Sequence, residues 1–201
     1  MAKANWIKTT PSQGSGNAIV NVSSTAEHTG RNVRPTTLTW KAANVADVIR
    51  TVNQAGKPEY VDIADAVSAD KAGKTVTITG ESNSKKLTFS LGTGELSVQI
   101  YRDEYTAGGI TLPNGEEIPG DPGASSKYEF SIRIDVPANT TTTARSRQII
   151  VTDGAGNQDV CTLTSIAGDA YITVQSGTIE LDYLGTAVAV AVESNTNWTI
   201  E

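Results

Sequence analysis

Paired carboxylates are the residues of this chain that come nearest to catalytic chemistry. Asp103-Glu104 and Glu116-Glu117 are two such pairs, and glycosidases use two acids on opposite sides of the bond that they cleave. Here the acids of each pair are adjacent and stand in a stretch rich in glycine and proline, where acidic side chains ordinarily serve solvation. His28 is the only histidine, and because no nucleophile motif surrounds it, we interpret it as a surface turn residue. The sequence predicts no catalytic residues, and we expect that the protein is not an enzyme.

Oxygen-bearing side chains at Asp153, Asn157 and Asp159 could surround a calcium ion. Their spacing departs from the EF-hand pattern, and the glycines between them are typical of a hairpin loop joining two strands. No glycine-rich loop leads from a strand into a helix, so a phosphate-binding loop is not indicated either. We therefore expect neither a metal ion nor a cofactor.

Aromatic side chains are the remaining candidates for ligand contact, because a flat exposed ring can stack against a sugar. Trp40 alternates with Leu38 near the end of a predicted strand, so we take it as a candidate glycan contact. The other interpretation is that Trp40 covers the edge of a sheet. Tyr101, Tyr105 and Tyr171 are further aromatic candidates.

Composition and charge exclude several partners. The 201 residues include 16 Lys and Arg against 22 Asp and Glu, a net charge of −6, and a nucleic-acid partner is not expected because phosphate binding requires a basic face. No run of about 18 apolar residues exists, so we expect no membrane partner. Lys8, Pro11 and Gln13 interrupt the first twenty residues, which cannot form the apolar core of a signal peptide. From this we expect a protein that is made in the cytoplasm and leaves it only by cell lysis.

Apolar and polar residues alternate with a period of two along most of the chain, which places one face of each strand in a core. The clearest case runs from Tyr128 to Val136, and valines alternate with alanines from Val188 to Val192. Short strands rich in threonine and valine, separated by glycine and asparagine turns, predict an all-β protein of tandem immunoglobulin-like sandwiches. Cys161, the only cysteine, lies in such a segment, so we expect a buried thiol and no intrachain disulfide.

An internal repeat organises the chain. Landmarks recur at an offset of 112 residues: Asp47-Val48 as Asp159-Val160, Ala55-Gly56 as Ala167-Gly168, and Glu81-Ser82-Asn83 as Glu193-Ser194-Asn195. Tyr60-Val61 corresponds to Tyr171-Ile172, one residue short of that offset. The sequence thus starts in the middle of one repeat and stops in the middle of another, a pattern that suggests an assembly protein.

The repeat divides the chain into three parts. Residues 1–57 form an incomplete immunoglobulin-like domain that lacks its opening strands, and residues 60–168 form a complete one. Residues 171–201 supply the opening strands of a further domain. The complete copy carries a long insertion at 103–126, which we expect to stay outside the sandwich core and to contact another protein or a second subunit.

Read from the C-terminal part into the N-terminal part, the sequence shows a known order of motifs. These are Gly185-Thr186, Asn195-Thr196-Asn197-Trp198, Trp6, Pro11-Ser12-Gln13-Gly14-Ser15-Gly16-Asn17 and Gln54-Ala55-Gly56. This order resembles the BACON domain, an immunoglobulin-like sandwich common in Bacteroidetes proteins and in crAss-like bacteriophages. Residues 60–168 resemble the same fold more loosely, because Lys86 stands where the first Trp is expected and Ile166 replaces the Gln.

The resemblance implies a structural role. A pair of such domains without a secretion signal looks like a phage virion component, an auxiliary or decoration protein of the capsid that is made in the bacterial host cytoplasm. Its expected partners are other copies of itself, head to tail, and a major capsid protein. The alternative is a non-catalytic carbohydrate-binding or adhesion module that contacts surface glycans.

The two incomplete parts fit one another in sequence, so we expect residues 171–201 of one subunit to complete residues 1–57 of a neighbour. The expected interface residues are apolar and come from both parts: Trp6, Ile19, Val20, Ile172, Val174, Ile179, Leu181, Val188, Val190, Val192 and Trp198. Trp6 and Trp198 are expected in the core or at the rim of the completed domain.

Overall fold

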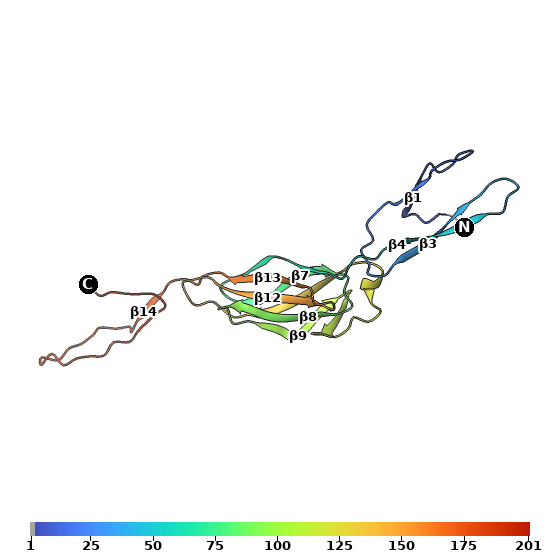
Figure 1. Cartoon of the computed structure of the whole chain (residues 1–201). Coiled ribbons are helices and arrows are strands. Elements are labelled where there is room, and N and C mark those ends of the chain that lie inside the picture. The colour runs from blue at the N-terminus through green and yellow to red at the C-terminus, as the bar shows by residue number, and fades with distance from the viewer. Residues whose placement is uncertain (1–2) are drawn as a thin grey trace.

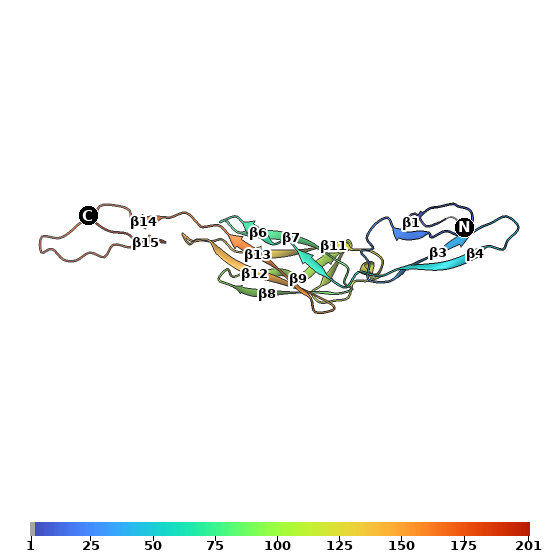
Figure 2. The same cartoon turned by 45° about the horizontal axis from the view of Figure 1, so that its top comes forward.

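The computed structural model describes residues 3–201. Apart from one short 3-10 helix, η1 (Pro122–Ala124), the regular structure of this part of the chain consists of strands β1 to β15. A sandwich occupies the middle of the molecule, a smaller unit from the N-terminal residues lies at one end, and a single hairpin from the C-terminal residues lies at the other (Figure 1). Figure 2 shows the same elongated arrangement from a second side, so the N-terminal unit and the C-terminal hairpin lie at opposite ends of a rod.

The central sandwich, residues 60–168, has two sheets. Their strand orders are β10-β9-β11-β7-β5 and β6-β13-β12-β8. The first sheet contains β5 (Val61–Ile63), β7 (Lys74–Ser82), β9 (Gln99–Ala107), β10 (Ile110–Pro113) and β11 (Tyr128–Val136). The second contains β6 (Ala66–Ala69), β8 (Leu87–Gly94), β12 (Arg145–Asp153) and β13 (Gln158–Ser165). The strands β5, β7, β9 and β11 take the places of A, B, D and E of an immunoglobulin domain, and β8, β12 and β13 those of C, F and G. The all-β, immunoglobulin-like class expected from the sequence is confirmed.

Side-chain alternation builds the core between these sheets. The inward residues of β11 are at most 8% exposed, whereas the residues between them are partly or fully exposed. The ring of Phe89 lies 5.3 Å from that of Tyr105 and 5.7 Å from that of Phe130, centroid to centroid. Tilted and edge-on ring pairs at such distances add to the stabilisation that burial provides.

The segment 103–126 belongs to this core, so the expectation that it stays outside is wrong. Its first residues end strand β9, and β10 pairs with them across a Gly108-Gly109 turn in which both φ angles are positive. Tyr105, Ala107 and Ile118 are at most 2% exposed. Two glycines between alternating segments predict a hairpin. The expectation failed because the acids and glycines around this turn resemble those of a solvated loop.

The N-terminal unit consists of two antiparallel hairpins. Strand β1 (Ile7–Thr10) pairs with β2 (Asn21–Ser24), and β3 (Arg34–Trp40) pairs with β4 (Val48–Gln54). Ile7 and Leu38 are its buried apolar side chains, and the Ser24 hydroxyl donates to Gln54 Oε1 at 3.2 Å between the two layers. The two hairpins form a small sandwich, and because each layer has only two strands, it buries little apolar surface.

The C-terminal hairpin has no second layer. Strand β14 (Ile172–Val174) pairs with β15 (Val192–Ser194), and the long segment between them is without regular structure. Its large apolar side chains, including Ile172, Leu181 and Val188, are about half exposed or more. A hairpin of this kind is marginally stable on its own in water.

Cys161 gives a test of the strand register. Its side chain is 0% exposed, as expected from the sequence, and burial is the main cause that raises the pKa of its thiol to about 11. Because the thiolate is the reactive form, we predict that a thiol reagent at about pH 8 modifies the native protein far more slowly than the unfolded one. The measurement is the labelling rate with and without denaturant.

Thr162 provides the matched control, since it lies next to Cys161 and is exposed on the other face of β13. A Cys161→Ala/Thr162→Cys variant should react in the native state at nearly the unfolded rate. Fast native labelling of Cys161 together with slow labelling of a cysteine at 162 would mean that the two faces of β13 have been exchanged.

Candidate functional site

A buried asparagine attaches the N-terminal unit to the central sandwich. Asn83 is 0% exposed, and its Nδ2 group donates to the carbonyl oxygens of Thr29 and Pro58 at 3.2 Å and of Lys57 at 3.3 Å. Its Oδ1 accepts the backbone N–H of Tyr60 at 3.0 Å. One planar amide therefore satisfies backbone groups that no strand ladder reaches. We call this contact between residues 28–32, 57–60, Asn83 and 121–125 the first joint.

Close backbone packing completes the first joint. The N–H of Arg31 donates to the Gly123 carbonyl at 2.9 Å, and the Arg31 guanidinium pairs with the Asp121 carboxylate at 2.6 Å. A Cβ on Gly123 would lie 1.9 Å from the carbonyl oxygen of Asn83. Only glycine permits this approach, which holds 121–125 against Asn83 and places the Gly123 carbonyl where Arg31 reaches it.

His28 also lies in the first joint, which corrects its interpretation as a surface turn residue. It is 6% exposed, and its Nε2 lies 2.7 Å from the carbonyl oxygen of Asn32. At the far end of the central sandwich Asn139 takes the same place: it is also 6% exposed and donates to the carbonyl oxygen of Thr143 at 2.9 Å. Each of these turn residues is buried because its own unit folds back over it: Asn139 also donates to the carbonyl oxygen of Ile166 at 2.9 Å.

The C-terminal hairpin is attached to the central sandwich by the same contact, which we call the second joint. Nδ2 of Asn195 donates to the carbonyl oxygens of Thr140 at 2.7 Å and Asp169 at 2.8 Å. Its Oδ1 accepts the N–H of Tyr171 at 2.9 Å. Asn195 is partly rather than fully buried, since no glycine segment equivalent to 121–125 covers it.

The hairpin also repeats the strand register of the complete domain. In the central sandwich Val61 pairs with Ser82 and Asp62 with Glu81. In the hairpin Ile172 pairs with Ser194 and Thr173 with Glu193. The hydroxyls of Ser82 and Ser194 donate to the carbonyls of Tyr60 and Tyr171, at 2.6 and 2.8 Å. Strands β14 and β15 therefore correspond to β5 and β7, the A and B strands.

The structural offset between repeats changes along the chain. The backbone N–H of Lys57 donates to the Gly30 carbonyl in the first joint, and that of Gly168 donates to the Thr141 carbonyl in the second. Both the donors and the acceptors are therefore 111 residues apart, as are Tyr60 and Tyr171. From Ser82 onward the offset is 112. The identity of Ala55-Gly56 with Ala167-Gly168 is thus one residue out of structural register, because backbone hydrogen bonds fix the alignment there.

The N-terminal unit and the hairpin hold complementary sets of strands. Strands β1, β2, β3 and β4 correspond to β9, β11, β12 and β13, the D to G strands, whereas β14 and β15 supply A and B. In the central sandwich β7 pairs with β11, and β6 pairs with β13. Among the described residues no strand pairs with β2 in the position of β7, and none pairs with β4 in the position of β6. Unpaired edges of this kind are templates for another strand.

The residues predicted for a subunit interface lie on these two open parts and do not meet within one chain. Trp6 is half-buried, with the Arg34 guanidinium 4.3 Å from its ring centroid. Val20, Val190 and Val192 are half-buried. The others are exposed: Ile19 85%, Leu181 63%, Ile179 54%, Ile172 52%, Val174 49%, Val188 49% and Trp198 47%. Only Val174 and Val192 are cross-strand partners.

Sequence reasoning found the repeated Glu-Ser-Asn landmark but missed its role. The asparagine of each copy, Asn83 and Asn195, is the joint residue, and Arg31 with Asp121 reinforces one of the two joints. The signal was available, because a buried polar side chain that recurs in both repeats requires backbone partners.

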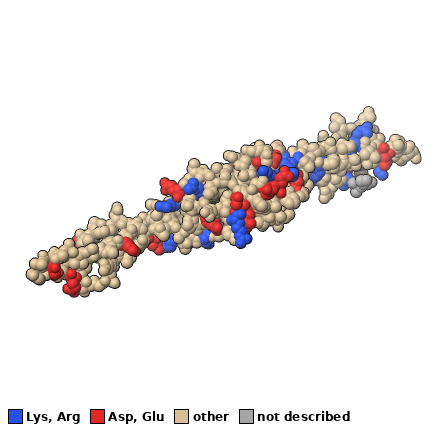
Figure 3. Space-filling model, turned by 90° about the horizontal axis from the view of Figure 1, so that it is seen from below, with Lys and Arg blue, Asp and Glu red and all other residues tan. Residues whose placement is uncertain are grey.

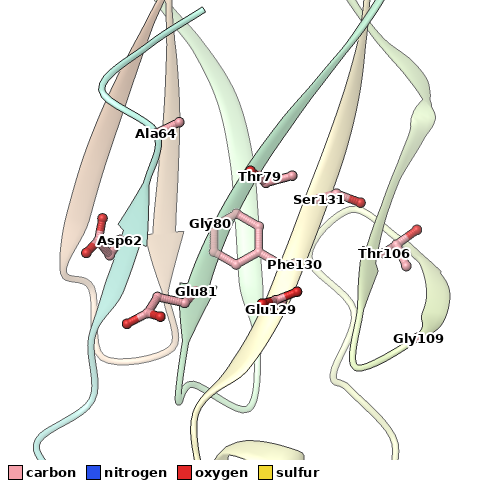
Figure 4. A pocket seen from close by; sticks show the side chains of 10 residues that line it. All are labelled: Asp62, Ala64, Thr79, Gly80, Glu81, Thr106, Gly109, Glu129, Phe130 and Ser131. Carbon is pink, nitrogen blue, oxygen red and sulfur yellow. The ribbon is translucent and has the colours of Figure 1, made fainter.

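A shallow hollow of about 730 Å³ lies on the outer face of the sheet formed by β5, β7, β11 and β9 (Figure 4). Its acids are Asp62, Glu81 and Glu129, and none of its ten lining residues is a histidine or cysteine. Lys127 Nζ lies 2.5 Å from Glu81 and lowers the pKa of that carboxyl. The carboxylate of Glu81 is therefore held in an ion pair at the edge of this hollow.

The acids singled out in the sequence have structural partners. Glu104 pairs with Arg133 at 2.6 Å, Glu117 pairs with Lys85, and Asp103 accepts from Asn114 at 2.9 Å. Asp153 closes the loop after β12 by accepting the N–H groups of Ala155 and Asn157, both at 2.9 Å. Within residues 3–201 no group of three or more histidine, cysteine, aspartate or glutamate side chains could hold a metal ion.

Trp40 ends strand β3 and is 40% exposed. Lys and Arg lie scattered among Asp and Glu and form no continuous basic face in the view of Figure 3. In the part of the chain that the structure describes, no helix has the length and apolar character needed to cross a membrane.

No protein-family model matches the chain, and no curated protein matches it. Solved structures show a distant likeness. An NMR structure of a protein from Bacteroides thetaiotaomicron is 13% identical, with a TM-score of 0.29, over 56% of this chain and 89% of that one. The cadherin-like domains 1 to 4 of zebrafish RET are 12% identical, with a TM-score of 0.31, over 70% of this chain and 35% of that one. The collagen-binding domain of the Erysipelothrix rhusiopathiae surface protein RspB is 10% identical, with a TM-score of 0.17, over 75% and 63%. At these TM-scores the likeness carries no argument about function.

The joints can be tested by removing each amide. We predict that Asn83→Ala lowers the free energy of unfolding by roughly 1–3 kcal/mol, because buried carbonyls lose their donor. Asn195→Ala should leave the unfolding of the central sandwich nearly unchanged and should speed hydrogen exchange at the Tyr171 amide. The measurements are denaturant unfolding and amide exchange.

Asn17, an exposed residue, is the control: Asn17→Ala should alter neither quantity. Wild-type stability of Asn83→Ala would show that the first joint is held by the Arg31 contacts instead.

Proposed function

We propose that this chain is a non-catalytic structural protein of a bacteriophage virion, an auxiliary or decoration protein that joins head to tail on the capsid by strand exchange. In this proposal residues 171–201 of one copy complete residues 1–57 of the next. The partners are further copies of the chain and a major capsid protein, and the protein is made in the bacterial host cytoplasm. The phage assignment depends on the resemblance of the permuted motifs to BACON domains.

The observation that carries the proposal is the complementarity of the two ends. One end has D to G strands with unpaired edges, and the other has an A–B hairpin with half-exposed apolar side chains. Each part is marginal alone, since an uncovered sheet edge and an isolated hairpin both leave backbone and apolar groups in water. Joining them supplies the missing strands to both.

The geometry favours completion by a second copy over completion within one chain. The two parts lie at opposite ends of the central sandwich (Figure 2), whose strands of about eight residues at ~3.3 Å each give a length of ~30 Å with loops. The connection 168–170 extends only about 10 Å and is held in the second joint. A head-to-tail contact produces rings if the rotation between copies closes and filaments if it does not.

A glycan-binding module is the second candidate, and the 40% exposure of Trp40 favours it. In that case assembly would present many Trp40 rings along one rod, and weak single contacts would add up through multivalency. This function does not exclude the structural one.

Truncation tests the structural proposal. We predict that residues 1–168 remain soluble, with an intact central sandwich, and fail to associate, whereas the full chain forms concentration-dependent oligomers. Sedimentation velocity measures association, and near-ultraviolet circular dichroism reports on the sandwich. Oligomers of residues 1–168 equal to those of the full chain would rule out strand exchange through the hairpin.

Retention on immobilised mucin or plant polysaccharide tests the glycan proposal. We predict that retention, if Trp40 carries it, is lost in Trp40→Ala and kept in Trp40→Phe, because a smaller ring still stacks. Retention that survives both substitutions would remove Trp40 from the proposed contact.

A further inference from the structure

We infer that the joint between copies is a sandwich of one fixed register, in which residues 186–194 of one copy pair antiparallel with residues 16–24 of the next. In this register Val188 opposes Val22, and Val190 opposes Val20. The inference rests on the proposed head-to-tail assembly and assigns the atoms that meet in it. The partner is a second copy of this chain.

The central sandwich supplies the register. There β7 pairs with β11, with Val76 opposite Ile134 and Ile78 opposite Ile132. Strand β15 repeats β7 at an offset of 112, as the shared pairing of Ser82 and Ser194 shows. Strand β2 takes the place of β11. Ser24 is opposite buried Ile7 and faces inward as Val136 does, which is an offset of 112, whereas the turn after β2 has the offset of 111. Carrying the pairing across at 112 residues places Val188 opposite Val22.

Inward-facing residues on the N-terminal unit agree with this register. Ser24 is opposite Ile7, which is 3% exposed, and its hydroxyl reaches Gln54 in the other layer. Ser24 therefore faces the interior, and Val22 faces the same side because side chains alternate along a strand. An extended continuation of β2 places Val20 inward as well and leaves Ile19 on the outer face.

The hairpin presents a matching row. Val188, Val190 and Val192 share one face once residues 186–191 extend β15 as a strand, since an alanine stands between each pair of valines. Val188 is 49% exposed and Val22 is 41% exposed, so both lose water contact when the rows meet. A shift by one residue would bring the alanines inward and leave the valines in water. Apolar burial thus selects the face of the strand, and the repeat offset selects among the registers that keep the valines inward.

The joints then become equivalent along the assembly. Each chain contains the first joint at Asn83 and the second joint at Asn195. Tyr60 and Tyr171 occupy the same place in the two joints. A completed sandwich would stand on the central one as the central one stands on the N-terminal unit. The assembly is therefore a row of similar domains, alternately made from one copy and from two.

Disulfide trapping tests the register in the full chain on a Cys161→Ala background. The pair Val22→Cys with Val188→Cys is inward-facing, and the pair Asn21→Cys with Ala189→Cys is the neighbouring outward-facing one. Opposite Cα atoms lie at about 4.5 to 5.5 Å in an antiparallel pair, within disulfide range. The off-register control, Val20→Cys with Val188→Cys, joins diagonal positions about 7–8 Å apart.

Mixing single variants separates the outcomes. We expect the Val22→Cys protein mixed with the Val188→Cys protein to give a disulfide-linked dimer on oxidation, and the double variant to give a ladder of higher species. A disulfide in monomeric double variant, with no dimer from the mixture, would overturn the second copy as the partner. Oligomers by sedimentation that trap only the off-register pair would overturn the register while leaving head-to-tail assembly intact. Absence of both oligomers and disulfides would overturn the proposed function and the inference together.

Discussion

The need to satisfy backbone groups between consecutive domains is the constraint on which this structure depends. At each joint the chain leaves one sheet and enters the next, and its carbonyls have no ladder partner there. At each joint one asparagine side chain donates hydrogen bonds to these carbonyls: Asn83 to three of them and Asn195 to two. Because an unpaired buried carbonyl is costly, the amide fixes the relative placement of the units.

This constraint makes the molecule a rod. The first joint is reinforced by Arg31, Asp121 and the glycine at 123, so that the N-terminal unit is held by ionic and backbone contacts together. The second joint has the amide without that cover. The difference follows from segment 103–126, which belongs to the core and carries the glycine segment against which the N-terminal unit packs. A segment that resembled a solvated loop is therefore part of the machinery that positions one of the open ends.

In the proposed assembly, the contact between two copies also satisfies backbone groups that have no partner within one chain. An A–B hairpin and a D-to-G unit each expose apolar faces and free edges, and they need the strands that the other has. The hairpin is already held in the orientation of opening strands by Asn195, so completing the sandwich does not require that orientation to form first, which lowers the ordering cost of association. Alternation of valine with alanine in the hairpin then decides which face of that strand is buried, since only the valine face is apolar enough to gain from burial.

The sequence by itself determined the fold class, the repeat and the buried thiol, because period-two alternation and chemical identity are local properties. Alternation from Tyr128 to Val136 is enough to place five side chains in a core. Tertiary structure decided what depends on contacts between distant segments. His28 is buried because another part of the N-terminal unit closes over it, Tyr105 lies in the core because β9 and β10 form a hairpin, and the repeat offset changes to 111 because hydrogen bonds of Lys57 and Gly168 fix the alignment. Sequence periodicity reports which face of a strand is apolar, but only the assembled backbone shows which polar groups remain to be satisfied.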